Sequence, residues 1–229
     1  MTRAPGDHLV LEVAGDLVEI RCSTTADGDF HIEGPRAALV HRRTAFAPGT
    51  WTQLDEVHGT AVLHVDAPGE HDFEVGDALV CRRRGCVLGV WVGDCAPVAF
   101  IGDAGAIGVA HAGWKGALDG VLQATVAAMR PDRVTAYLGP CIHACCYEFG
   151  TEELAAFTDR FGGQVAATTA WGSPALDMPA VVRAALAECG VALVGESRCT
   201  GCDAAHYWSH RRRRQAGRQV MTICRRAPG

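Results

Sequence analysis

Short apolar runs separated by polar turns occupy the middle of the chain. Four such runs cover residues 77–81, 87–91, 98–101 and 107–110, and the segments between them are rich in arginine, aspartate, glycine and proline. Uninterrupted apolar runs of this length are typical of strands that are buried on both faces of a sheet. The pattern therefore predicts four adjacent strands in the centre of the fold.

A helical periodicity follows these strands. Between residues 118 and 129, apolar side chains recur every three or four positions, and Arg130-Pro131 ends the pattern. Two further helices are expected where Thr151 and Asp177 stand in a capping position before an apolar stripe. A shorter helix is expected at residues 35–46.

Alternating apolar positions near both ends of the chain predict additional strands. Residues 9–22 have the pattern of a hairpin with a glycine-led turn at Gly15-Asp16. Further strands are expected at residues 59–65, 134–138, 191–194 and 219–224. The mixture of predicted helices and strands indicates an α/β (α+β) fold, and no repeat or linker divides the sequence. Residues 1–229 are expected to form a single layered domain with a mixed β-sheet flanked by helices.

Composition and charge narrow the classes of function. The chain has 229 residues, of which 48% are hydrophobic, and a formal net charge of -5. A general nucleic-acid binder would be basic, so no nucleic-acid partner is expected. No apolar stretch reaches the ~18 residues of a membrane span, and the first residues lack the apolar core of a secretion signal. We therefore expect a cytoplasmic protein that acts on small molecules, and the sequence leaves its oligomeric state open.

The sequence contains eleven cysteines, an odd number in a long chain. In a reducing compartment, free thiols or metal ligands are favoured over disulfides. Cys22, Cys86 and Cys189 fall in apolar periodic stretches, so we expect them in the core, where a free cysteine behaves as a small hydrophobe.

A second group of cysteines has no role that spacing alone assigns. Cys145 and Cys146 are adjacent, Cys199 and Cys202 form a Cys-x-x-Cys motif, and Cys141 precedes both pairs. These residues could bind a second metal, although no matching second Cys-x-x-Cys is present. The motif could instead be a redox pair, although its flanking elements are not thioredoxin-like. Both interpretations stay open.

Candidate chemistry centres on one cysteine and two histidines. Cys95 lies in a turn between two predicted strands, His111 ends a later strand, and His58 lies upstream. Neighbouring strand ends can bring such side chains to one edge of a sheet. Two imidazoles and one thiolate suit a borderline-soft cation such as zinc, and three protein ligands leave a fourth position for water or substrate. The same residues also fit a buried cysteine beside an unrelated histidine.

Polar residues near this set suggest further roles. Asp94 could orient water or take a proton, or it could be a solvated turn residue. Lys115 stands at a glycine-flanked helix start that could cradle an anion or phosphate. Arg211 and Arg212 belong to a run of four arginines that could clamp phosphate or form a solvated loop. The predicted catalytic residues are Asp94, Cys95 and His111, and the predicted phosphate-binding residues are Lys115, Arg211 and Arg212.

The order of these motifs resembles that of the YfiH/LACC1 family, whose members are described as multicopper polyphenol oxidases (laccases) or as purine nucleoside phosphorylases. The family pattern comprises a histidine-glycine pair, an aspartate-cysteine-x-proline turn and a histidine-alanine-glycine-tryptophan-basic-glycine turn. A glycine-proline-x-isoleucine loop, a cysteine-threonine pair and a serine-x-arginine-arginine segment follow. In this chain they stand at His58-Gly59, Asp94-Cys95-Ala96-Pro97, His111–Gly116, Gly139–Ile142, Cys199-Thr200 and Ser209–Arg212.

The resemblance implies a zinc ion held by His58, Cys95 and His111 in a layered α/β fold. It also implies that purine nucleosides and phosphate are the substrates, with phosphorolysis of adenosine, guanosine, inosine or methylthioadenosine and deamination of adenosine as the reactions. Three positions depart from the usual family pattern: Glu56 replaces glutamine, Gly93 replaces alanine and His210 replaces tyrosine.

Two other functions fit part of the pattern. A copper-dependent polyphenol oxidase would use a similar ligand set, but its three-copper cluster needs closely spaced histidine pairs. The ten histidines of this chain include no His-x-His pair. A metal-free cysteine hydrolase would use Cys95 as the nucleophile and His111 as the base.

Overall fold

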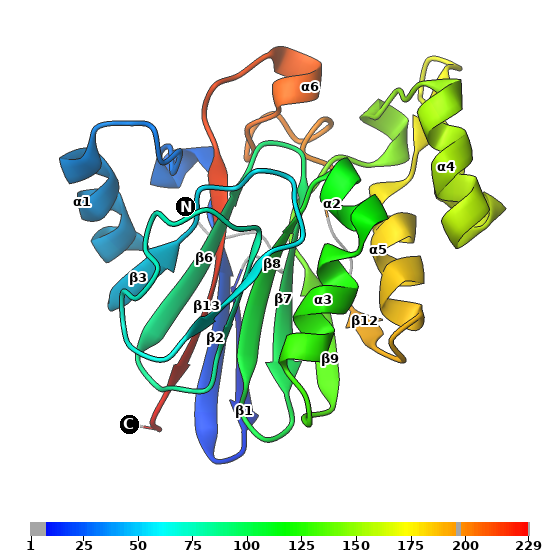
Figure 1. The fold of residues 1–229 in the computed structure, drawn as a ribbon. Coiled ribbons are helices and arrows are strands. Elements are labelled where there is room, and N and C mark those ends of the chain that lie inside the picture. The colour runs from blue at the N-terminus through cyan, green and yellow to red at the C-terminus, as the bar shows by residue number, and fades with distance from the viewer. Residues whose placement is uncertain (1–7, 196–197, 229) are drawn as a thin grey trace.

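The computed structural model describes residues 8–195 and 198–228 and confirms a mixed α/β fold (Figure 1). Its strands form two large sheets and one small one. The first large sheet has mostly antiparallel pairs, with one parallel pair at its β3 edge. Its strand order is β1 (His8–Val13), β2 (Asp16–Cys22), β13 (Gln219–Arg226), β6 (Cys86–Val92) and β3 (Thr50–Gln53).

The second large sheet has six strands, with antiparallel pairs in its centre and a parallel pair at each edge. Its strand order is β12 (Ala192–Val194), β9 (Val134–Leu138), β7 (Ala96–Gly102), β8 (Ile107–Ala112), β5 (Ala78–Cys81) and β4 (Val62–Val65). A separate two-stranded antiparallel sheet joins β10 (Ala166–Thr168) to β11 (Pro174–Leu176).

Helices cover the outer faces of both large sheets, so the molecule has four layers (Figure 1). The α-helices are α1 (Arg36–Phe46), α2 (Trp114–Asp119), α3 (Val121–Ala128), α4 (Thr151–Phe161), α5 (Met178–Ala187) and α6 (His210–Arg213). Short 3-10 turns are η1 (Thr25–Asp27), η2 (Ala144–Cys146) and η3 (Gly163–Val165). None of the helices in the described ranges is long and apolar enough to cross a membrane.

Three apolar clusters hold the layers together. Leu88 and Ile223 of the first sheet pack with Leu79 of the second sheet in the space between the sheets. On the opposite face of β5, Val80 belongs to the cluster under α3 and α5. Similarly, Val87 of β6 packs in the cluster under α1. Because successive residues of one strand enter different clusters, both faces of these strands are buried and their sequences show no alternation.

This two-sided burial explains why one predicted strand neighbourhood is wrong. Strand β6 does not join β5, β7 and β8 but pairs with β13 and β3 in the other sheet. A strand that is apolar on both faces fits either sheet of a helix-covered sandwich, so its apolar run carries no information about its partners.

Other predicted elements are confirmed with local corrections. In place of the single helix expected over residues 118–129, the structure has two helices, α2 and α3, divided by Gly120, whose φ of 104° breaks the helical path. The N-terminal hairpin turns at Ala14 and Gly15, because Asp16 already pairs with Val13. Asp177 caps α5 by accepting a hydrogen bond from the amide of residue 180, at 3.1 Å.

The expected helix cap and core cysteines have mixed outcomes. Helix α4 is capped by Gly150, and Thr151 is its first residue. Of the three cysteines expected in the core, Cys22 and Cys86 are buried, whereas Cys189 is partly exposed.

Candidate metal centre and site cavity

Strand register brings Cys95 and His111 to one end of the six-stranded sheet. In the antiparallel pair of β7 and β8, Pro97 lies opposite His111 and Ala96 lies opposite Ala112. Cys95 immediately precedes β7, so its side chain and that of His111 leave neighbouring strands at the same edge. The predicted approach of these two strand ends is thus present in the fold.

His58 reaches the same place from the loop before β4. One donor atom from each of His58, Cys95 and His111 lies within 4.8 Å of the others. The Cys95 Sγ atom is 3.6 Å from His58 Nε2. A zinc ion about 2.3 Å from sulfur and about 2.0–2.1 Å from nitrogen would set such donors roughly 3.6 Å apart at the tetrahedral angle. The three side chains therefore fit a zinc ion with one coordination position left for a ligand.

Asp77 fixes both histidines. Its Oδ1 lies 2.9 Å from His111 Nδ1 and accepts a hydrogen bond from the His58 amide at 2.8 Å, while Oδ2 accepts from the Gly59 amide at 2.7 Å. With Nδ1 engaged, the remaining nitrogen of His111, Nε2, is the one available to a metal. The sequence signal for Asp77 is an acidic residue at the start of a buried apolar run, and no role in the site was predicted for it.

The His58 loop requires two glycines of the α2 segment. His58 itself has a φ of 60°, in the left-handed region that residues other than glycine adopt less often. A Cβ atom on Gly113 would stand 2.2 Å from Cδ2 of His58, and one on Gly116 would stand 2.7 Å from the Gly59 carbonyl oxygen. These two glycines were predicted as part of an anion-binding helix start. In the structure, their lack of side chains allows the His58 loop to lie directly on α2.

A second buried carboxyl group, Glu56, stands behind the histidines. Its Oε1 accepts a hydrogen bond from the Trp91 amide at 2.8 Å, and its Oε2 lies 3.6 Å from His111 Nδ1 without a hydrogen-bond partner. Burial raises the pKa of Glu56 to about 8. In the sequence, Glu56 stands out only as a departure from the family pattern, with no predicted role in the site.

The same surroundings perturb Cys95 and His111. Burial alone would raise the pKa of Cys95, but the charge of His111 and hydrogen bonds from both imidazoles lower it to about 6. Burial would likewise lower the pKa of His111, but neighbouring negative groups raise it well above its ordinary value. The negative charges of Glu56 and Cys95 and the hydrogen bond to Asp77 are the interactions that hold this proton on His111. Metal binding would displace it, because zinc requires a thiolate and neutral imidazoles.

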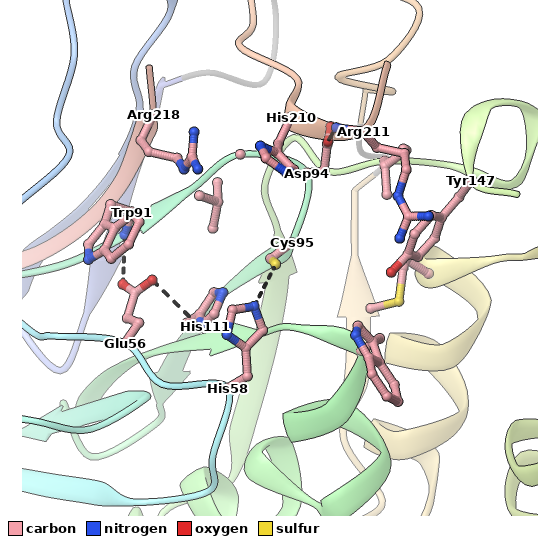
Figure 2. A pocket seen from close by; sticks show the side chains of 15 residues that line it. Glu56, His58, Trp91, Asp94, Cys95, His111, Tyr147, His210, Arg211 and Arg218 are labelled. Carbon is pink, nitrogen blue, oxygen red and sulfur yellow. Dashed lines mark hydrogen bonds and ion pairs between the residues drawn. The ribbon is translucent and has the colours of Figure 1, made fainter. Parts of the chain in front are cut away.

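A cavity of about 350 Å³ opens in front of the three donors. Figure 2 shows His58, Cys95 and His111 on one side of it, with Arg211 and Arg218 across from them. We call this space the site cavity. Its wall includes five further side chains that combine aromatic, apolar and basic character: Trp91, Trp114, Tyr147, Met178 and His210.

Asp94 connects the cavity to the segment that contains the four arginines, Arg211 to Arg214. This residue is buried, has a φ of 99° and accepts hydrogen bonds on both carboxylate oxygens. Oδ1 accepts from the Thr200 hydroxyl and Oδ2 accepts from the Arg211 amide, both at 2.6 Å. The carboxylate thereby anchors the start of α6 beside Cys95, and neither oxygen is left without a donor.

The predicted phosphate-binding residues are placed differently from one another. Arg211 lines the site cavity, with its guanidinium 5.0 Å from the centre of the Tyr147 ring. Arg212 lines an adjacent depression and stacks over Trp171. Lys115 is exposed on α2 and lies outside the set of residues that line the site cavity. Arg218, which the sequence did not single out, does line it.

Comparison with known proteins finds similarity over most of the chain. The family model described as multi-copper polyphenol oxidoreductase laccase matches residues 22–226. A purine nucleoside phosphorylase from Xylella fastidiosa strain Temecula1 is 37% identical over 210 residues, which cover 86% of this chain and 80% of the relative. The Escherichia coli K12 protein named purine nucleoside phosphorylase YfiH is 34% identical, with coverage of 86% and 82%.

Two further similarities concern deamination and fold. A protein from an unknown prokaryotic organism, named adenosine deaminase RL5, is 34% identical over 62% of this chain and 59% of its own length. The crystal structure of a Neisseria meningitidis protein, NMB0706, superposes with a TM-score of 0.82 at 26% identity, covering 96% of this chain and 99% of that one.

Proposed function

This chain belongs to the family of the multi-copper polyphenol oxidoreductase laccase model, which includes YfiH, and on that premise we propose that it is a zinc-dependent purine nucleoside phosphorylase that also deaminates adenosine. The names of its relatives support both reactions. The proposed substrates are purine nucleosides together with phosphate or water.

One observation carries the proposal: a three-donor metal set and a basic wall face each other across the same cavity (Figure 2). The volume of about 350 Å³ lies within the range of small-molecule sites. A structural zinc site would have four protein ligands, whereas His58, Cys95 and His111 supply three and leave one position toward the cavity.

When bound, zinc would act as a Lewis acid that polarises a bound oxygen. Asp77 would hold two of the ligands in place for this chemistry, because its carboxylate contacts Nδ1 of His111 and accepts a hydrogen bond from the His58 amide. Zinc is favoured over a three-copper cluster, because the groups of described residues able to hold a metal contain two histidines, His58 and His111.

The basic wall is proposed to hold the phosphate. Arg211 and Arg218 offer guanidinium groups, which suit phosphate oxygens through paired N–H donors. His210 lines the same wall. In phosphorolysis, these residues would orient a phosphate oxygen toward the sugar carbon while positive charge develops on the ribose. Arg212 and Lys115 would contribute at most to the charge around the entrance, because neither lines the cavity.

Glu56 is proposed to contact the purine base. Its Oε1 is occupied by the Trp91 amide, whereas Oε2 is buried 3.6 Å from His111 Nδ1 without a hydrogen-bond partner, and the residue lines the cavity. A protonated carboxyl group would present a hydrogen-bond donor at this atom, as would the amide of the glutamine that is usual in the family. A donor here stabilises negative charge on the leaving base. Asp94 is then a positioning residue, because both of its oxygens already accept hydrogen bonds.

A direct experiment tests this proposal. Purified protein is analysed for metal content and then incubated with adenosine, inosine and guanosine, with and without phosphate. We expect ribose 1-phosphate and free base when phosphate is present, and inosine with ammonia from adenosine. Cys95→Ala should remove the metal held at the three-donor centre and both reactions, whereas Cys189→Ala, which changes a partly exposed cysteine outside the site, should retain them.

Two outcomes would overturn the assignment. Turnover that survives complete metal removal would favour a cysteine hydrolase with Cys95 as the nucleophile and His111 as the base; His58 also lies 3.6 Å from the Cys95 sulfur. Trapping a covalent adduct on Cys95 would identify that mechanism. Stoichiometric copper with oxidation of polyphenols would favour a laccase instead.

A further inference from the structure

Four cysteines gather in a second cluster that the proposed reaction does not use. Cys145 and Cys146 come from η2, which follows β9, and Cys199 and Cys202 come from the segment after β12. One sulfur from each lies within 4.8 Å of all the others. We call this group the cysteine quartet. It shares no residue with the set formed by His58, Cys95 and His111.

The sulfur separations have the size of a tetrahedral metal site. Cys202 Sγ lies 3.4 Å from the sulfurs of both Cys145 and Cys146, and Cys145 Sγ lies 3.6 Å from Cys199 Sγ and 3.9 Å from Cys146 Sγ. Zinc bound at about 2.3 Å to four sulfurs sets the sulfurs about 3.8 Å apart. A disulfide would require about 2.05 Å, with the four thiols drawn into separate pairs.

The backbone around the quartet is shaped to bring the two segments together. The amides of Cys202 and Asp203 both donate to the Cys199 carbonyl, at 3.2 and 3.0 Å, which forms a tight turn between the two ligands. The His143 amide donates to Cys199 Sγ at 3.4 Å, a contact that would orient and stabilise a metal-bound thiolate.

Gly201 is required inside this turn. A Cβ atom at position 201 would stand 2.6 Å from Cys146 Cβ and 2.8 Å from Cys146 Sγ. The turn Cys199-Thr200-Gly201-Cys202 therefore lies directly against η2 only because this position has no side chain. Arg213 holds the turn from the other side by donating to the carbonyls of residues 200 and 201, at 3.0 and 2.9 Å.

We propose that the cysteine quartet binds one zinc ion as a closed structural site. Four thiolate ligands saturate a tetrahedral ion and leave no position for substrate, which distinguishes this site from the three-ligand centre. Cys202 is exposed and provides a route for the ion to enter. The resulting negative charge would lie beside the basic segment that contains Arg212 and Arg213.

The site would brace the wall of the cavity. Thr200, between the ligands Cys199 and Cys202, donates its hydroxyl to Asp94, and Asp94 in turn accepts from the amide of Arg211. A metal at the quartet would thus cross-link η2 to the turn after β12, and the hydrogen bonds through Asp94 connect that turn to the start of α6. This role does not depend on which reaction the site cavity performs.

Metal analysis of matched variants tests the proposal. The double variant Cys199→Ala/Cys202→Ala should contain one equivalent of zinc less than the unaltered protein, whereas Cys189→Ala should lose none. Cys95→Ala should lose the other equivalent and keep the one at the quartet. Zinc content that is unchanged in the double variant would overturn the proposal, as would one equivalent of iron at this site.

A second measurement keeps the quartet intact and does not require the double variant to fold. Cys95→Ala protein, in which the other thiolate ligand is absent, is stripped of metal under reducing conditions and titrated with Co²⁺. We expect one equivalent to produce the thiolate-to-cobalt charge-transfer absorption of a tetrahedral four-sulfur site, and Zn²⁺ should displace it. Absence of this absorption would refute the assignment. Disulfides within the quartet in freshly purified protein would refute it too.

Discussion

His111 Nδ1 lies 2.9 Å from Asp77 Oδ1, and the same carboxylate accepts hydrogen bonds from the backbone amides of His58 and Gly59. One buried side chain therefore orients both imidazoles of the candidate metal centre. It links the end of β8 to the loop before β4, two segments that the chain order does not join. This relationship makes Asp77 a positioning residue whose effect is separable from that of the ligands themselves.

Asp77→Asn should weaken metal binding without removing a ligand. An asparagine side chain has one oxygen where Asp77 has two. It therefore cannot accept hydrogen bonds from His111 and from both backbone amides, and the His111 ring and the His58 loop lose their fixed orientation. We expect zinc affinity to fall by roughly 10- to 100-fold, the usual effect of losing such a partner. Competition with a chromophoric chelator measures it, with the exposed Asp66→Asn as the control. Equal affinities would show that Asp77 does not orient the ligands.

Glu56→Gln and Glu56→Ala should behave differently. Glutamine keeps an acceptor for the Trp91 amide and a donor toward the cavity, so we expect kcat/KM to stay within about tenfold of the unaltered enzyme. Alanine removes both, and the loss of a donor to developing charge should lower kcat by about 100-fold or more. Zinc content, measured in parallel, should be unchanged in both variants. A similar loss in the two variants would contradict the proposed donor role.

Gly93→Ala should weaken phosphate binding through Arg218. A Cβ at position 93 would stand 2.8 Å from Arg218 Cδ, so the arginine must move away from its present place in the cavity wall. Loss of one charged hydrogen bond, about 1.5–3 kcal/mol, corresponds to a rise of roughly 10- to 100-fold in the KM for phosphate, with kcat little altered. Steady-state kinetics at varied phosphate concentration measures the effect.

A double-variant cycle separates this effect from a general disturbance. If Gly93→Ala acts by displacing Arg218, then it should add little to Arg218→Ala. Additive effects of the two substitutions would show that Gly93 acts elsewhere.

Asp132→Asn should reduce stability at neutral pH and have little effect in acid. Burial alone would raise the pKa of Asp132, but hydrogen bonds from Arg82 at 2.7 Å and from the Ala106 amide at 3.1 Å hold it below its usual value. Because the folded pKa lies below the unfolded one, the carboxylate stabilises the fold at higher pH. That contribution is lost as the pH falls through the folded pKa.

The expected cost of Asp132→Asn at pH 7 is about 1–3 kcal/mol in the free energy of unfolding. Urea unfolding at pH 7 and at pH 3 measures it, with the exposed Asp119→Asn as the control. A difference from the unaltered protein that remains constant between the two pH values would contradict the linkage.

The sequence by itself predicted most of the helices and strands and a set of three metal ligands. The repeat of apolar residues predicted most helices and strands, because burial of one helical stripe or of both faces of a strand leaves a local pattern. Cys95, His111 and His58 stood out because thiolate and imidazole are the donors that zinc prefers, and their motifs match those of a known family.

Only the tertiary structure decided which segments meet. The local sequence did not show which strands belong to which sheet, because β6 would be buried on both faces in either of the two large sheets. Asp77, Glu56 and Arg218 carry no distinctive spacing, and their roles depend on strand register and on a cavity built from distant loops. The sequence left Cys141, Cys145, Cys146, Cys199 and Cys202 open between a second metal site and a redox pair, and the fold gathers four of them, without Cys141, at the sulfur separations of a tetrahedral site. Long-range contacts of this kind depend on packing between elements, which a local pattern does not encode.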